Sequence, residues 1–191
     1  MGRYESNLLS VTEILDMAGL TDYFNIPDKE YYFSLGHAVD YATQLVDENN
    51  LGECEEVVLP YMEGYKNFLN DTGFEILHNQ KHVMSVLYGF QGTLDKVGKL
   101  WKHRVVIDTK CSAICEPWYH WQTAGYMIGY NEEYKQPNSV QKRYILNLHP
   151  SLGERKYKLT PCKNENDLSI FKAAIVIARA RKENKLWKPQ D

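Results

Sequence analysis

The chain has 191 residues, of which 43% are hydrophobic and 13% aromatic, and its formal net charge is −3. This composition excludes a disordered chain, and no apolar run approaches the ~20 residues that a membrane span requires. The length predicts a single domain over residues 1–191. Cysteines at positions 54, 111, 115 and 162 are more typical of a reducing cytoplasm than of a disulfide framework.

Two helices are expected at the start of the chain. Ser10 or Thr12 is placed to cap a short helix over residues 11–17, and a second helix is expected over residues 28–47. The second helix carries His37 and Asp40, which are three residues apart and therefore share one helical face. A plain surface position is the ordinary interpretation of both residues.

The next elements are a helix and several short strands. A helix is expected within residues 54–70, where Pro60 either starts it or kinks it. Short strands are expected over residues 74–77 and 83–87, and a further strand over residues 91–97.

Charged residues follow the apolar run at positions 105–107. Asp108 and Lys110 alternate on a strand over residues 104–110, so both point to one face. If this strand pairs with the preceding one as a hairpin, Asp95 lies close to Asp108. Two neighbouring carboxylates repel each other, and a hard divalent cation such as Mg²⁺ or Mn²⁺ relieves that repulsion.

Such a cation can hold a hydrolytic water and a phosphate oxygen. Lys110 beside it can orient or deprotonate the water, and the main-chain carbonyl of Thr109 is a further oxygen ligand. The pattern therefore indicates metal-assisted phosphodiester hydrolysis. A solvated strand end is the alternative, because an acid two residues before a lysine is a common motif.

Basic residues cluster at the connection between these two strands. The expected nucleic-acid contacts are Lys96, Lys99, Trp101, Lys102 and Arg104, with Trp101 either stacking on a base or packing on the domain. The wider charge distribution agrees with a polyanionic partner. Residues 1–75 contain 3 Lys and Arg against 15 Asp and Glu, whereas residues 76–191 contain 19 against 10. A solvated surface of mixed charge explains the same counts equally well.

The rest of the chain predicts two helices with two strands between them. A helix begins near Glu116 and carries Gln122 and Tyr126 on one face, while His120 is assigned no role. Strands are expected over residues 143–148 and 156–159, and a last helix runs from a cap at Asn166 or Asp167 to Arg181. The element order predicts an α/β fold, in which a central mixed, mainly antiparallel sheet is flanked by helices.

Four short motifs in this order resemble the PD-(D/E)xK nuclease superfamily, and within it the RecB-like branch that includes many phage exonucleases. They are Gly36-His37-Ala38-Val39-Asp40, Gly92-Thr93-Leu94-Asp95, Asp108-x-Lys110 and Gln122-x-x-x-Tyr126, and they cover roughly residues 10–130. The resemblance implies a restriction-endonuclease-like core. It implies that Asp95 and Asp108 bind the metal, that Lys110 is the catalytic lysine, and that Gln122 and Tyr126 position the site or the nucleic acid.

Several positions depart from the family pattern. Asp40 occupies the place of a metal-binding histidine, with His37 one helical turn earlier, so either residue is a candidate third ligand. Cys111 follows the lysine where the family usually has Thr or Ser, and Gln80 stands where an acid is often seen. Some RecB-like nucleases hold an iron–sulfur cluster on four cysteines, but the scattered spacing here favours ordinary thiols.

The resemblance implies a Mg²⁺- or Mn²⁺-dependent deoxyribonuclease, more typically an exonuclease, that acts in phage or bacterial DNA recombination or repair. The expected compartment is the cytoplasm of a bacterium, or of the host if a phage encodes the protein. Two alternatives stay open. One is a catalytically inactive module of the same fold that binds nucleic acid or a protein. The other is activity only within an assembly that contains an annealing protein.

Overall fold

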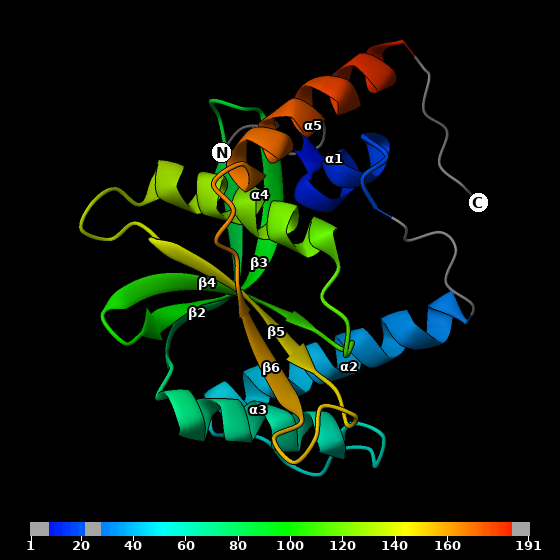
Figure 1. Cartoon of the computed structure of the whole chain (residues 1–191), viewed down its shortest axis with the longest axis vertical. Helices are drawn as coiled ribbons and strands as arrows, with labels where there is room; N and C mark the ends of the chain where they lie inside the picture. Colours follow the sequence, from blue (N-terminus) through cyan, green and yellow to red (C-terminus); the bar gives the residue numbers. More distant parts are fainter. Residues whose placement is uncertain (1–7, 22–27, 185–191) are drawn as a thin grey trace.

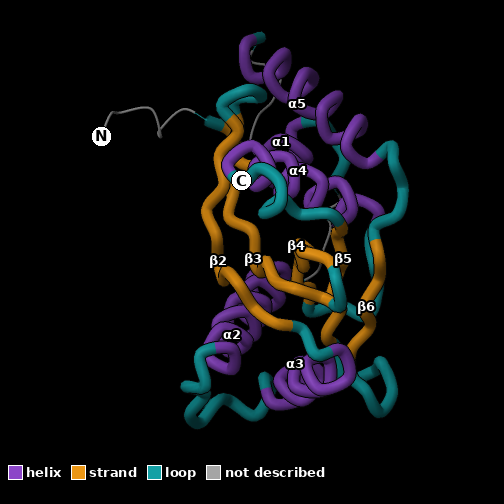
Figure 2. The backbone as a smooth tube through the Cα atoms, turned by 90° about the vertical axis from the view of Figure 1, so that its left-hand side faces the viewer, coloured by secondary structure: helices purple, strands orange, loops and turns teal. Residues whose placement is uncertain are grey.

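The computed structural model describes residues 8–21 and 28–184. Within them, one mixed sheet lies between two layers of helices, with α1, α4 and α5 on one face and α2 and α3 on the other (Figures 1 and 2). The helices are α1 (Val11–Met17), α2 (Lys29–Asp47), α3 (Leu59–Thr72), α4 (Pro117–Glu133) and α5 (Asp167–Glu183). The strands are β1 (Leu9–Ser10), β2 (Glu75–Ser85), β3 (Phe90–Leu100), β4 (His103–Lys110), β5 (Lys142–Leu148) and β6 (Tyr157–Pro161).

The sheet has six strands in the order β1-β3-β4-β5-β6, and β2 pairs with the other edge of β3. Three pairings are antiparallel (β2–β3, β3–β4 and β5–β6), and two are parallel (β1–β3 and β4–β5). The predicted fold class, a mixed and mainly antiparallel sheet flanked by helices, is confirmed.

Strand β4 is buried on both faces because helices cover both sides of the sheet. Val106 packs into the cluster formed with α1, α4 and α5, whereas Val105 and Ile107 pack into the cluster formed with α2 and α3. This alternation follows from the two-residue period of a strand. It explains why an unbroken apolar run leads directly to the charged residues at the end of β4.

The helix starts agree with the local signals in the sequence. Ser10 caps α1 in a capping box, in which Ser10 Oγ accepts from the Glu13 N–H and the Glu13 carboxylate accepts from the Ser10 N–H. Pro60 lies in the first turn of α3, so it starts that helix and does not kink it. Among the helices of residues 8–21 and 28–184, none combines the length and apolar character of a transmembrane segment.

Two strands are longer than the sequence pattern predicts. Residues 75–85 form one edge strand, although two short strands were expected, because the polar residues in its middle pair with β3 by their main chains. Strand β3 continues to Leu100 and does not end near Val97, so Trp101 and Lys102 alone turn the chain into β4. Main-chain pairing tolerates polar side chains on an edge strand, which hydrophobic periodicity cannot detect.

Candidate active site

Asp95 and Asp108 lie together where the pairing of β3 and β4 ends. The last paired residues are Lys96 and Ile107, so the next step along each strand brings Asp95 opposite Asp108. Beyond this point, Asp95 Oδ2 accepts a hydrogen bond of 2.8 Å from the main-chain N–H of Thr109. This hydrogen bond takes the place of a main-chain hydrogen bond between β3 and β4. It keeps the Asp95 carboxylate at the point where the two strands separate.

Lys110 is held between β4 and α4. Its Nζ lies 2.7 Å from Asp108 Oδ2 and donates a hydrogen bond of 2.8 Å to Gln122 Oε1. The Gln122 amide in turn donates to the Tyr126 hydroxyl and to Thr12 Oγ1, both at 3.2 Å. The structure therefore brings the lysine and the predicted helix residues together through direct contacts.

The amine of Lys110 also faces two aromatic rings of α4. Its Nζ lies 4.9 Å from the centroid of the Tyr119 ring and 5.4 Å from that of Trp118. A cation this close to the faces of aromatic rings is attracted to them. These contacts restrict the position of the ammonium group, and sequence analysis gave Tyr119 no part in the site.

Helix α2 contributes a third carboxylate, that of Asp40. Asp40 Oδ2 accepts hydrogen bonds from Gln80 Nε2 at 2.9 Å and from Gln44 Nε2 at 3.2 Å. Asp40 Oδ1 is buried and has no hydrogen-bond partner among the described residues. Gln80 lies on β2 opposite Asp95 by register and has a φ of 45°, in the left-handed region that non-glycine residues seldom adopt.

Burial and the neighbouring charge of Asp95 raise the pKa of two of these acids, Asp40 and Asp108. Burial raises the pKa of Asp40 to about 6, and the charge of Asp95 adds to this effect. Burial raises the pKa of Asp108 to about 7, where the charge of Lys110 opposes the shift and that of Asp95 increases it. Excess negative charge in a buried place is relieved by a proton or by a cation.

The donor atoms fit a hard divalent cation in chemical type. Carboxylate oxygens of Asp95, Asp108 and Asp40 are ligands that Mg²⁺ and Mn²⁺ prefer, and the unpartnered Oδ1 of Asp40 is a free acceptor at this place. However, residues 8–21 and 28–184 contain no group of three His, Cys, Asp or Glu side chains already arranged to hold an ion.

Two other predicted ligands take different positions. The N–H of Thr109 faces Asp95, and the carbonyl of a strand residue lies on the same edge as its N–H, so this carbonyl also faces the opening. His37 is exposed on α2, and its charge lowers the pKa of Asp40. Since Asp40 is the residue that Gln80 orients, the geometry favours Asp40 over His37 as the third ligand.

The prediction that Lys96 contacts nucleic acid is wrong. Lys96 is fully buried, its Nζ lies 2.7 Å from Asp47 Oδ2, and it donates a hydrogen bond of 3.0 Å to Asn79 Oδ1. Tyr65 completes this arrangement by donating to Asp47 Oδ1 at 2.6 Å. Lys96 points inward because its partner in the ladder is Ile107, whose side chain lies in the core between the sheet and α2 and α3.

The other predicted contacts lie around the β3–β4 turn, away from the carboxylates. Trp101 is 67% exposed at the turn, and Lys99 and Lys102 are also exposed. Arg104 donates hydrogen bonds to the main-chain and side-chain oxygens of Asn138. Trp101 lies six positions after Asp95 in the chain, or roughly 20 Å along an extended strand. Contact of this turn with nucleic acid stays a prediction.

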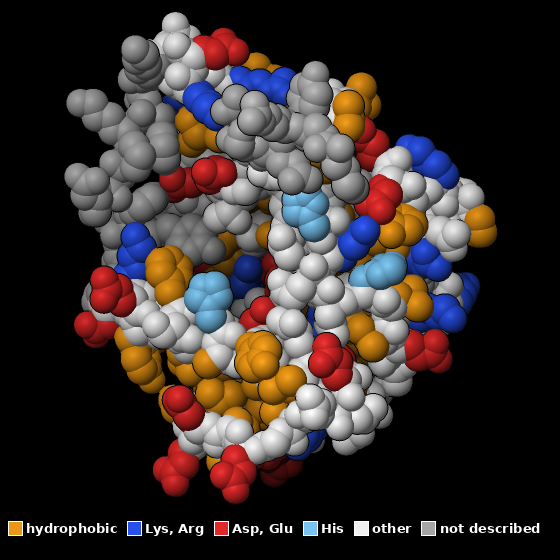
Figure 3. Space-filling view, turned by 180° about the vertical axis from the view of Figure 1, so that it is seen from behind, with side chains coloured by type: hydrophobic (Ala, Val, Ile, Leu, Met, Phe, Trp, Pro, Cys, Tyr) orange, Lys and Arg blue, Asp and Glu red, His pale blue; other side chains and the backbone are white. Residues whose placement is uncertain are grey.

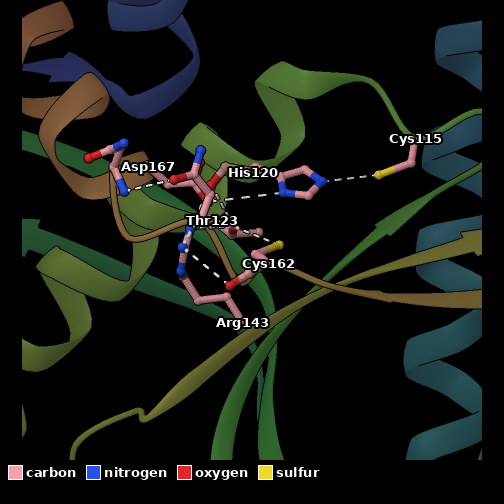
Figure 4. A network of polar contacts seen from close by, with 8 residues as sticks. Cys115, His120, Thr123, Arg143, Cys162 and Asp167 are labelled. Carbon is pink, nitrogen blue, oxygen red and sulfur yellow. Dashed lines mark hydrogen bonds and ion pairs between the residues drawn. The ribbon is translucent and has the colours of Figure 1, made fainter.

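A second polar network fixes the opposite side of α4 (Figure 4). Arg143 of β5 donates to the main-chain oxygen of His120 at 2.7 Å and lies 2.9 Å from the buried carboxylate of Asp167 on α5. The network consists of Cys115, His120, Thr123, Arg143, Cys162 and Asp167. Gln122 lies between His120 and Thr123 in the chain. The contacts of these two residues with Arg143 therefore hold the turn of α4 that carries Gln122.

The network corrects two expectations. His120 was assigned no role, but its carbonyl accepts from Arg143 and its Nε2 lies 3.4 Å from the Cys115 sulfur. Asp167 was a candidate helix cap, but it is buried as the ion-pair partner of Arg143, and Asn166 is the N-cap residue. All four cysteines of the chain are free thiols.

Sequence analysis also missed Asn147. It lies opposite Lys110 in the β4–β5 ladder, and its amide donates to the carbonyls of Ser112 and Ile114 at 2.9 and 3.0 Å. It thereby fixes the loop that follows Lys110. The available signal was an asparagine inside the apolar run of residues 144–148, because a buried polar side chain requires partners.

No protein-family model matches this chain, and no curated protein matches it significantly. Among solved structures, the alkaline exonuclease LHK-Exo from Laribacter hongkongensis is similar at 12% identity and a TM-score of 0.44, over 94% of this chain and 89% of that one. Its complex with dAMP gives 11% identity with the same coverage and TM-score. The structure of SSO0001 gives 13% identity and a TM-score of 0.46, over 96% and 78% of the two chains. These sequence identities and TM-scores are too low to assign a function, so the function is argued from the residues of the site.

Proposed function

We propose that this chain is a divalent-metal-dependent nuclease that hydrolyses phosphodiester bonds in DNA, and that it acts as an exonuclease. One observation carries the proposal: Asp95, Asp108 and Lys110 meet where β3 and β4 separate, and α2 adds Asp40 beside them. The resemblance of the short motifs to the RecB-like branch supports the choice of DNA and of an exonuclease.

In this proposal Asp95 and Asp108 hold Mg²⁺ or Mn²⁺, with Asp40 as a third ligand and the Thr109 carbonyl as a further one. The bound cation would supply Lewis-acid stabilisation of the phosphate and a more acidic water. Lys110 would act on the attacking water and on the phosphate. Its ammonium group can orient the attacking water and neutralise charge that develops on the phosphate oxygens.

Gln122 and Tyr126 would position this lysine. Lys110 is held by Asp108 on one side and by Gln122 on the other, at 2.7 and 2.8 Å, so loss of either partner lets the amine move. Gln122 is itself held by Tyr126 and Thr12. A displacement of a catalytic group by about 1 Å is enough to lower a rate strongly.

The test is digestion of linear DNA with Mg²⁺ or Mn²⁺ by the wild-type chain and by Asp108→Asn and Lys110→Met. We expect each substitution to lower the rate by about a hundredfold or more. Lys172→Met is the control, because Lys172 is an exposed lysine on α5 and is not a predicted nucleic-acid contact. Digestion that is unchanged in both site variants would refute the assignment.

A second candidate function is a catalytically inactive module that binds nucleic acid or a protein. It is favoured by the contact of Lys110 with Asp108 and by the lack of a ready-made set of three ligands in the described residues. Calorimetry with Mn²⁺ distinguishes the two functions. Binding that Asp95→Asn abolishes supports the nuclease, whereas DNA binding without any Mn²⁺ binding supports the inactive module.

A further inference from the structure

Two pairs of aromatic rings lie near the end of β4, and together they form an aromatic cluster. Tyr31 and Tyr32 come from α2, Tyr61 from α3, and His149 directly follows β5. The rings of Tyr31 and Tyr32 meet edge to face with centroids 5.5 Å apart, and those of Tyr61 and His149 meet likewise at 6.1 Å. Tyr31 is 54% exposed and Tyr32 is 53% exposed, so this aromatic cluster presents two rings to solvent.

The aromatic cluster adjoins the candidate active site. Cys111, which directly follows Lys110, packs against the same hydrophobic core cluster that contains Tyr61. Burial raises the pKa of Tyr61, and its neighbours Cys111, Tyr31 and Tyr32 add to this effect. Tyr32 and Asp40 lie on the same helix, eight residues or about 12 Å apart. On the face seen in Figure 3, hydrophobic side chains gather next to a hollow in which charged side chains of both signs are visible.

The chain segment that supplies three of the four rings is poor in basic side chains. Tyr31, Tyr32 and Tyr61 belong to the part of the chain, residues 1–75, that holds 3 basic and 15 acidic side chains. Phosphate groups are attracted to clustered lysine and arginine, which this part lacks. Nucleobases stack on aromatic rings whatever their sequence, because every base has a π face.

We propose that the aromatic cluster stacks the bases of a single-stranded DNA end whose backbone reaches the acids and Lys110. This inference rests on the proposed nuclease function and adds a substrate class to it. A single strand is required because the bases of a duplex already stack on one another. The distance of about 12 Å corresponds to three or four base steps at ~3.4 Å each.

The test compares two fluorescent oligonucleotides of equal length and charge, ten thymidines and ten abasic sites, by fluorescence anisotropy. The protein carries Asp108→Asn so that it leaves the probe intact. We expect Tyr31→Ala with Tyr32→Ala to weaken binding of the thymidine probe by about tenfold and to leave the abasic probe unchanged. Tyr31→Phe with Tyr32→Phe keeps both rings and should retain wild-type binding.

Leu87→Ala is the control, since Leu87 is an exposed apolar side chain at the turn between β2 and β3 and is not a predicted nucleic-acid contact. Trp101→Ala tests the competing prediction that a base stacks at the β3–β4 turn. Any of three results would overturn the stacking proposal. The tyrosine substitutions could weaken binding of both probes equally, only Trp101→Ala could weaken binding, or the protein could bind both probes with equal affinity.

Failure of the two proposals is distinguishable. If wild-type protein digests DNA but the tyrosine variants bind both probes like wild type, only the stacking proposal fails. If no DNA is digested but the preference for the thymidine probe depends on the two tyrosines, the nuclease proposal fails and base stacking stands. Unchanged thermal unfolding of the double variant excludes misfolding as the cause.

Discussion

Gln80 on β2 donates a hydrogen bond of 2.9 Å to the carboxylate of Asp40 on α2. The two residues are 40 positions apart in the sequence. The other carboxylate oxygen, Asp40 Oδ1, has no hydrogen-bond partner among the described residues. An amide donor favours the charged form of a carboxylate and fixes its orientation. In the proposed metal site, Gln80 would therefore hold Asp40 in an orientation that suits a cation ligand.

The first prediction concerns Gln80→Leu. Loss of the amide donor should lower the Mn²⁺ affinity by about tenfold, the smaller end of the range found when a residue that orients a metal ligand is removed. Isothermal titration calorimetry checks this. Gln91→Leu, on β3 and away from the acids, is the control. Equal Mn²⁺ affinity in Gln80→Leu and wild type would show that Asp40 is not oriented in this way.

The second prediction concerns Gln122 and Tyr126. Gln122→Leu removes an acceptor of the Lys110 amine, so kcat on linear DNA should fall by about tenfold to a hundredfold while KM stays nearly constant. Tyr126→Phe should have a smaller effect of the same kind, since it acts through Gln122. Tyr130→Phe, one turn further along α4, is the matched control. A change confined to KM would assign Gln122 to substrate binding.

The third prediction concerns pH and the stability of the metal-free protein. The pKa of Asp40 is raised to about 6 and that of Asp108 to about 7, so the folded protein binds more protons than the unfolded chain from about pH 4 to 7. The contribution of these acids to stability is complete below pH 4 and is lost as the pH rises through 6 and 7.

Urea unfolding with a chelator at pH 5 and pH 8 measures this contribution. Asp108→Asn should reduce the loss of stability between the two pH values, whereas exposed Glu154→Gln should not change it. Mn²⁺ should raise the unfolding temperature more at pH 8 than at pH 5, because protons compete with the cation for the same oxygens. An equal shift at both pH values would contradict the clustered carboxylates.

The fourth prediction concerns the buried pair of Lys96 and Asp47. Lys96→Met leaves the Asp47 carboxylate without its buried partner and should lower the free energy of unfolding by about 3–5 kcal/mol. Lys99→Met, which breaks an exposed pair with Glu75, should change it by about 0.5 kcal/mol or less. Addition of Asp47→Leu to Lys96→Met should recover part of the loss. A stable Lys96→Met chain that binds DNA poorly would restore Lys96 to the nucleic-acid surface.

Local signals predicted the parts of the fold that depend on neighbouring residues. The start of α1 follows from a capping residue, which is Ser10 of the two candidates Ser10 and Thr12, and the start of α3 follows from Pro60. The continuity of β2 does not follow from such signals. Its middle is polar and is held in the sheet by main-chain bonds to β3, which side-chain periodicity cannot reveal.

The sequence by itself determined the order of the helices and the nearness of Asp95 to Asp108, because a strand has a period of two and a short turn sets the register of a hairpin. Only the tertiary structure decided that Gln80 orients Asp40, that Gln122 holds Lys110 and that Lys96 is buried against Asp47. Each of these contacts joins elements that helix packing against the sheet brings together, and their distance in space is not encoded in any local pattern of residues.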